Sequence, residues 1–150
     1  MSSRSNSRRI QILSQLSGRS SWDQLILSAY TLGLIPFDSK DQALQLITVN
    51  ATGYQNSLNE ATSIDDLEVL ADELQIGNLD PTPNDDSVTF DEMVDTIQDY
   101  ISKWLPNYNE NLSWESILNS INAFQIAEVQ LPTTRSDFYK YIRQYFPVSR

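Results

Sequence analysis

The residues of this chain best suited to chemistry are carboxylates at helical spacing. Two pairs stand three residues apart and therefore on one face of a helix: Asp65 with Glu68, and Glu92 with Asp95. Carboxylate oxygens are the ligands that Mg²⁺ prefers, and two such pairs on facing helices could hold one ion. Metal sites built from His or Cys are excluded, because the chain contains neither residue.

This arrangement resembles the paired acidic motifs on facing helices of all-α nucleoside triphosphate pyrophosphatases, and the resemblance implies a Mg²⁺-dependent enzyme. It covers only the stretch from Asp65 to Asp95. Helical geometry opposes it, because at about 100° per residue Glu92 and Asp95 point away from the apolar stripe of their helix. A carboxylate-only magnesium enzyme is therefore the third of three hypotheses, and we assign no metal ligand.

The composition excludes the commonest catalytic sites. Without His or Cys there is no Ser-His or Cys-His pair, and no Gly-rich phosphate-binding loop is present. Residues 80–91 form an oxygen-rich loop like those that bind Ca²⁺, but Asp85 replaces the Gly that the sharp turn requires. We expect a protein that is not an enzyme, with no catalytic residue, no cofactor and no small-molecule substrate.

Charge is distributed unevenly along the chain, although its net value is -10. No Lys or Arg occurs between Glu60 and Asp99, a stretch that contains thirteen acids. The ends are basic: four Arg precede the first acid, and four Lys or Arg lie in the last sixteen residues beside the single acid Asp137. The acidic segment is either a solvated face or a docking surface for a basic partner.

If the acidic segment is a docking surface, specific residues become candidates for binding the partner. The candidate partner-binding acids are Asp65, Asp66, Asp72, Glu73, Asp85, Asp86, Asp91, Glu92, Asp95 and Asp99. The candidate partner-binding basic residues are Arg4, Arg8, Arg9 and Arg143. The expected partner is a protein with a basic surface or a further copy of this chain. Nucleic acid could be contacted only through the N-terminal arm, and no stretch is apolar enough to cross a membrane.

The elements that would position these charges are three stretches with the same kind of start. They begin at Ser21-Trp22-Asp23, Ser63-Ile64-Asp65 and Ser113-Trp114-Glu115. Apolar residues follow every three to four positions at the same offsets in each, which predicts three amphipathic helices. The matched sets are Trp22, Leu25, Ala29 and Leu32; Ile64, Leu67, Ala71 and Leu74; and Trp114, Ile117, Ile121 and Phe124. Ser20 and Ser63 are the predicted N-terminal caps of the first two helices.

A proline-containing turn follows each of these helices, which should end near Leu34, Ile76 and Ile126. Return helices are then expected to begin near Asp38, Thr89 and Thr134. The first of them should end near residue 50, so that 50–62 and 102–112 are connectors. Its predicted core positions are Ala43, Leu46 and Val49.

The chain is therefore predicted to be all-α, with about seven helices in tandem hairpins that form a compact bundle or a short solenoid. A basic N-terminal arm and short helix are expected at 1–19, followed by one domain at 20–150. The hairpin units would span about 20–50, 63–104 and 113–147.

These features favour a non-enzymatic protein–protein interaction module that forms oligomers, a structural or adaptor subunit of a larger assembly such as a virion. The alternative is an acidic inhibitor that imitates nucleic acid and blocks a nucleic-acid-binding protein. The expected location is the cytoplasm or a virion, and not outside the cell, because the start lacks the apolar segment of a secretory signal. The middle unit is the first choice for the functional surface, because it holds most of the acids.

Overall fold

The computed structural model of this chain describes residues 14–77, 86–107 and 111–145. They contain the helices α2 (Trp22–Thr31), α3 (Lys40–Glu60), α4 (Ile64–Leu74), α5 (Asp86–Trp104), α6 (Trp114–Ala123) and α7 (Arg135–Arg143). No strand occurs in these residues, so the all-α class is confirmed, and the six helices are close to the predicted number of about seven. The predicted arm and most of the short helix after it lie outside the described residues.

Serine caps begin the three repeated helices, α2, α4 and α6. The side-chain oxygens of Ser21, Ser63 and Ser113 each accept a hydrogen bond at 3.1 or 3.2 Å from the backbone N–H three residues on. Such a cap satisfies one of the free N–H groups of the first helical turn. The predicted cap Ser63 is confirmed. The predicted cap Ser20 is wrong, because Ser21 caps α2, and the Ser21 backbone N–H donates in return to the side-chain oxygen of Gln24.

The same three helices also end alike. Gly33, Gln75 and Gln125 each stand twelve residues after the capping Ser and have left-handed backbones, with φ of 78°, 59° and 56°. The N–H of the following residue reaches back to the carbonyl five residues earlier, at 2.9 to 3.1 Å. This is the hydrogen-bonding pattern of a Schellman end, and it stops each helix two or three residues before the predicted end. The repeat therefore extends from one helix end to the other.

All twelve apolar positions that define the repeat face the core. Nine are buried, and the other three are half-buried against them. Trp114 shows what such a position contributes: its ring stacks on Phe37 with centroids 6.0 Å apart, and its indole N–H donates to Asp23 at 3.2 Å. The predicted stripes are confirmed, and this one ties α6 to the start of α2.

The longest helix, α3, runs without a break for 21 residues. The connector predicted at 50–62 is therefore wrong over most of its length. Asn50 and Gly53 lower the helix propensity there, which is why the sequence predicts a break. Packing of other helices along both halves of α3 overrides that local preference.

The buried face of α3 also differs from the prediction. It consists of Ala43, Ile47, Ala51 and Leu58, which lie one or two helical turns apart. Of the other two predicted core positions, Leu46 is half-buried and Val49 is 68% exposed. The apolar pattern of this helix is weak, and the neighbouring helices select which side faces inward.

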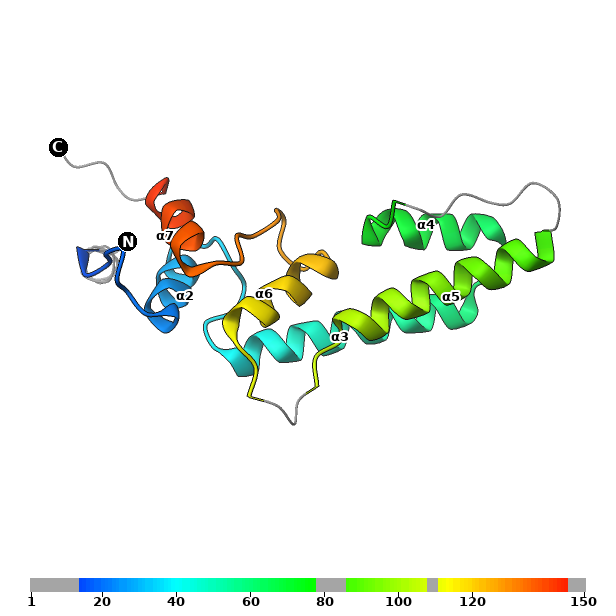
Figure 1. The fold of residues 1–150 in the computed structure, drawn as a ribbon, viewed down its shortest axis with the longest axis horizontal. Helices are drawn as coiled ribbons and strands as arrows, with labels where there is room; N and C mark the ends of the chain where they lie inside the picture. Colours follow the sequence, from blue (N-terminus) through cyan, green and yellow to red (C-terminus); the bar gives the residue numbers. More distant parts are fainter. Residues whose placement is uncertain (1–13, 78–85, 108–110, 146–150) are drawn as a thin grey trace, which may run out of the picture.

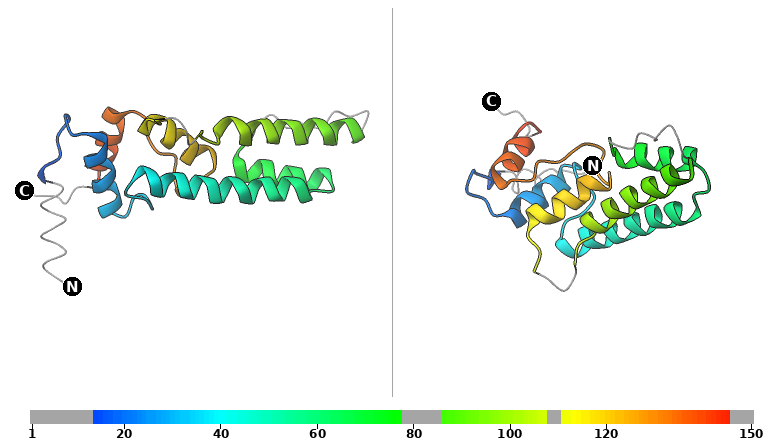
Figure 2. Two further views of the ribbon diagram at one scale, coloured as in Figure 1. Left: turned by 90° about the horizontal axis from the view of Figure 1, so that it is seen from below. Right: turned by 45° about the vertical axis from the view of Figure 1, so that its right-hand side comes forward.

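Three helices pack against α3 (Figures 1 and 2). α6 packs along its first half and α4 and α5 along its second half, while α2 and α7 pack together near the end where α3 begins. Lys40 donates to the carbonyl of Leu112, ahead of α6, at 2.7 Å. Further along, the amides of Gln55 and Gln98 exchange hydrogen bonds of 2.8 Å between α3 and α5. These contacts fix the order of α6 and α5 along α3.

Helix pairing does not follow chain order. α4 turns back on α3 after a short turn at 61–63. α5 then runs parallel to α4, since the Tyr100 hydroxyl near the end of α5 bonds to the Leu74 carbonyl at the end of α4 (Figure 1). The main partner of α2 is α7, and that of α6 is α3. The bundle is confirmed, but the first and third units exchange helices, and the second packs its two helices in parallel.

The left-handed residue should affect stability in opposite directions in two of the repeats. Gly33→Ala should lower the free energy of unfolding by about 1 kcal/mol, because a side chain at positive φ is strained even where it meets no neighbour. Gln75→Gly should raise it by about 1 kcal/mol, because that strain is already present at Gln75. Urea denaturation measures both changes.

Gly53→Ala is the matched control. Gly53 lies inside α3, and an added Cβ there also meets open space. Alanine should stabilise the protein by about 0.5 to 1 kcal/mol at this site, through helix propensity. Equal effects of alanine at Gly33 and Gly53 would contradict the left-handed backbone of Gly33.

Candidate functional site

The acids singled out by the sequence lie on α4 and α5, at the end of the molecule opposite α2 and α7 (Figure 1). Eight of the ten have described side chains, and all eight are exposed. They are Asp65, Asp66, Asp72, Glu73, Asp91, Glu92, Asp95 and Asp99, which we call the acidic surface. Asp85 and the side chain of Asp86 lie outside what the structure describes. Because α4 and α5 pack side by side, the exposed faces of the two helices adjoin.

The outer face of α4 carries acids around one apolar side chain. Leu67, Ala71 and Leu74 belong to the buried face of this helix. Asp65 and Asp72 lie two turns apart on the opposite side, and Val69, which is 60% exposed, lies between them. This face therefore offers negative charge and an exposed apolar side chain together.

Asp66 has a local structural role. One of its carboxylate oxygens accepts hydrogen bonds from the backbone N–H of Thr62 at 3.0 Å and from the Thr62 hydroxyl at 3.3 Å. The backbone hydrogen bond from Thr62 is the main reason that the pKa of Asp66 lies below its ordinary value, because it favours the charged form. Asp66 therefore holds the turn that starts α4, whatever it contributes to a partner.

Glu73 is set apart from the other acids on α4. It lies on the side that faces α3, where it lines a shallow hollow with Asn50, Gly53 and Ser57. Tyr54 lines the same hollow, and its pKa lies above the ordinary value, first because the hydroxyl is partly buried and second because of the charge of Glu73. A partner on the outer face of α4 would reach Glu73 less readily than Asp65 or Asp72.

The carboxylates considered for Mg²⁺ are not gathered into a ligand set. Glu68, Glu92 and Asp95 are exposed, and no group of three or more acids in the described ranges is placed to hold a metal ion. Glu68 takes a repeat position that is buried in the other two units, yet its own side chain is exposed. The oxygen-rich loop at 80–91 lies largely outside the described residues.

The predicted basic residues fall only partly within the described chain. Arg143 is exposed at the end of α7, whereas Arg4, Arg8 and Arg9 lie outside the described residues. A cation that the sequence left unassigned holds the fold: Arg135 donates to the carbonyls of Gly18 and Ser20 at 2.9 and 2.8 Å. These acceptors precede Arg135 by more than a hundred residues, so no local pattern reveals the contact.

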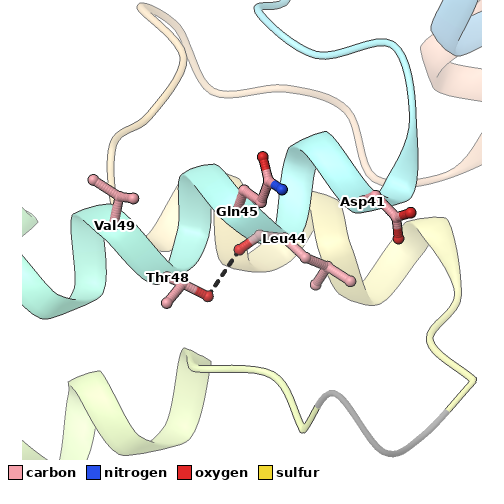
Figure 3. A pocket seen from close by; sticks show the side chains of 5 residues that line it. All are labelled: Asp41, Leu44, Gln45, Thr48 and Val49. Carbon is pink, nitrogen blue, oxygen red and sulfur yellow. Dashed lines mark hydrogen bonds between the residues drawn. The ribbon is translucent and has the colours of Figure 1, made fainter.

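An open and mainly apolar hollow lies on the outer side of α3 (Figure 3). Its volume is about 510 Å³, and its described lining comes from this one helix: Asp41, Leu44, Gln45, Thr48 and Val49. The Thr48 hydroxyl already donates to the Leu44 carbonyl at 2.9 Å. Asp41 is the only titratable group of that lining, so no pair of groups is placed for proton transfer. The described lining of this hollow therefore has no catalytic arrangement.

A polar pocket that the sequence did not reveal lies where α4 and α6 end. Its volume is about 280 Å³, and Gln75, Gln125, Tyr100 and Trp104 contribute to its lining. The one sequence signal was the repeat, since Gln75 and Gln125 stand at equivalent positions. Their approach in space depends on the parallel packing of α4 and α5, which no local pattern specifies.

No protein-family model, curated protein or solved structure matches the chain. In the described part of the chain, no helix combines the length and apolar character needed to cross a membrane. The protein is thus a helical bundle with an acidic surface at one end, and that surface is its candidate functional site.

Asp66→Asn should lower the free energy of unfolding at neutral pH and leave it unchanged in strong acid. The pKa of folded Asp66 lies below the unfolded value of about 3.9, so the charged form stabilises the fold above that pH. This contribution is lost as pH falls through the folded pKa. Urea denaturation across this pH range should therefore give two curves that converge in acid.

Asp65→Asn is the control for charge in the first turn of α4, because Asp65 is an exposed acid at the same helix end. It should have the smaller effect at neutral pH. A destabilisation by Asp66→Asn that persists at full size in acid would contradict the role given to the charged carboxylate.

Proposed function

We propose that this protein is a non-enzymatic interaction module, a structural or adaptor subunit of a larger assembly such as a virion. Its acidic surface docks the basic surface of a protein partner or of another copy of the chain. The observation that carries the proposal is the exposure of all eight acids of the acidic surface, within a sequence that has no Lys or Arg from Glu60 to Asp99.

Asp72 and Asp99, two acids of this surface, contribute little to the stability of their own helices. Asp72 lies in the last turn of α4, where the partial negative charge of the helix end disfavours a carboxylate, and Asp99 lies further from the end of α5. Within the described residues, neither makes an ion pair. A basic partner would remove this repulsion, so the charge of these two acids is better explained by docking than by helix stability.

Val69 provides an apolar contact within the acidic surface. Protein interfaces generally bury an apolar centre inside a polar rim. The 60% exposure of Val69 on the same face as Asp65 and Asp72 fits that anatomy. Charge would then direct the approach and register of the partner, while burial of Val69 would add affinity.

A second copy is the partner that the chain itself offers. Lys140 and Arg143 lie in the last turn of α7, at the opposite end of the molecule from the acidic surface (Figure 1). An end-to-end contact would bring these opposite charges together. Contacts of this head-to-tail kind repeat from copy to copy and generate rings or filaments, which suits a structural subunit.

Neutralising three acids should abolish salt-sensitive self-association. The variant carries Asp72→Asn, Asp95→Asn and Asp99→Asn. The unmodified chain should associate at low salt and dissociate at high salt, because ions screen exposed charges over about 10 Å at 0.1 M. The variant should remain monomeric at low salt. Light scattering and sedimentation over a range of protein concentrations measure both.

The matched control carries Asp38→Asn, Glu115→Gln and Glu128→Gln. It removes the same charge from exposed residues outside the acidic surface and should associate like the unmodified chain. A chain that stays monomeric at every concentration and ionic strength would exclude the self-assembly version.

A different partner is tested by pull-down from the native source with the same three proteins. A basic protein retained by the unmodified chain and the control, but lost with the acid variant, would support docking. Competition of DNA or RNA for that protein would favour the inhibitor alternative. Retention indifferent to all three acids would remove the acidic surface from the proposal.

A further inference from the structure

Two helices of the bundle end at one place. α4 and α6 approach each other with their C-terminal ends, and the hydroxyl of Tyr100, from α5, lies between them. This oxygen is 2.7 Å from the carbonyl oxygen of Ala123 and 3.3 Å from that of Leu74. Close by, the Tyr54 hydroxyl donates to the carbonyl of Phe124 at 3.1 Å. Tyr54 of α3 and Tyr100 of α5 therefore donate hydrogen bonds to carbonyls at these helix ends.

Carbonyl acceptors outnumber the tyrosine hydroxyl donors at this junction. The last carbonyls of a helix have no partner within the helix. Tyr100 has one hydroxyl hydrogen for two carbonyls, so that of Leu74, at the longer distance, is the less satisfied. Each helix end also carries a partial negative charge of about half an elementary charge. The junction thus favours a positively charged hydrogen-bond donor.

A pocket of about 280 Å³ opens at the junction. Its described lining has no charged side chain, and its polar and aromatic members include Gln75, Tyr100, Trp104, Asn119, Gln125 and Gln130. Pockets for whole small molecules begin at about 300 Å³, so this one is suited to the end of a single side chain.

We propose that this pocket binds the guanidinium group of an arginine side chain presented by the basic partner. The inference rests on the proposed function for the source of the arginine. A guanidinium is planar and has five N–H donors and no acceptor. It would supply the donors that the Leu74 carbonyl lacks. The side-chain amides of Gln75 and Asn119 make no hydrogen bond within the described residues, so their oxygens are also open to it.

Trp104 adds a second reason for a cation. A guanidinium stacks favourably on an aromatic face, and tryptophan is the best ring for this interaction. The ring of Trp104 already attracts a positive charge, since the Lys103 ammonium nitrogen lies 5.0 Å from its centre. Lys103 would compete with an incoming cation. Removing the charge of Lys103 should therefore strengthen the binding of a cation but not that of a neutral ligand.

The experiment uses the full chain and a small probe, N-acetyl-arginine amide. Amide and indole signals in NMR titrations should shift in a saturable way at Gln75, Asn119 and Trp104. N-acetyl-citrulline amide has the same shape without the charge, and it should bind about tenfold more weakly. N-acetyl-lysine amide, a cation without the planar group, should fall between them.

Three variants refine the test. Trp104→Leu should raise the dissociation constant of the arginine probe about three- to fivefold by removing the ring. Lys103→Gln should lower it, because the competing charge is gone. Asn119→Ala, at an exposed position, should raise it, whereas Asn56→Ala, exposed on α3 and outside the pocket, should leave it unchanged. Circular dichroism checks that each variant is folded. If Trp104→Leu is not folded, the effect of Asn119→Ala on the dissociation constant tests the pocket instead.

Equal binding of the arginine and citrulline probes, shifts confined to other residues, or no saturable shift would each overturn the inference. A pocket that fails these tests beside an intact, acid-dependent association would remove the pocket and leave the proposed function. Binding of the arginine probe without any acid-dependent association would remove the proposed function and leave the pocket.

Discussion

The architecture depends on α3 remaining helical through Asn50 and Gly53. α6 packs on the half of α3 before this point, and α4 and α5 on the half after it, so a break would separate the bundle into two parts. Tyr54, next to Gly53, reaches the end of α6, and Gln55 pairs with α5. Two weak helix formers are held in place because their neighbours in sequence make contacts on both sides. Tertiary packing supplies most of the stability of such a helix.

Three helices share both ends and differ in what they expose. A capping serine and a left-handed residue twelve positions later fix their length, so the repeat specifies local geometry. Burial then differs between the copies. α4 and α6 both pack against α3 and α5, but six residues of α6 are buried and four of α4, whose outer side remains in contact with water. Glu68 and Val69 are tolerated on α4 because none of the described helices covers that side.

The proposed docking features lie where the fold leaves charge unbalanced. One is the outer side of α4 and α5, where exposed acids face water in a stretch of sequence without Lys or Arg. The other is the junction of α4 and α6, where helix dipoles add negative potential and the carbonyls outnumber the hydroxyl donors. Both involve α4, the first helix of the unit that holds most of the acids. A single basic partner could therefore contact acids by charge and the junction by a specific hydrogen-bonding group.

The sequence by itself determined the helical class, the apolar stripes and the starts of the repeated helices, because caps and periodicity are local properties of the chain. It also determined that the acids would be exposed, since they alternate with apolar positions on amphipathic helices. Only the tertiary structure decided that α3 is unbroken, that α2 pairs with α7, and that α4 lies parallel to α5. It also decided that Gln75, Tyr100 and Asn119 meet in one pocket. These outcomes depend on contacts between residues far apart in the chain, and a local pattern compatible with several pairings cannot choose among them.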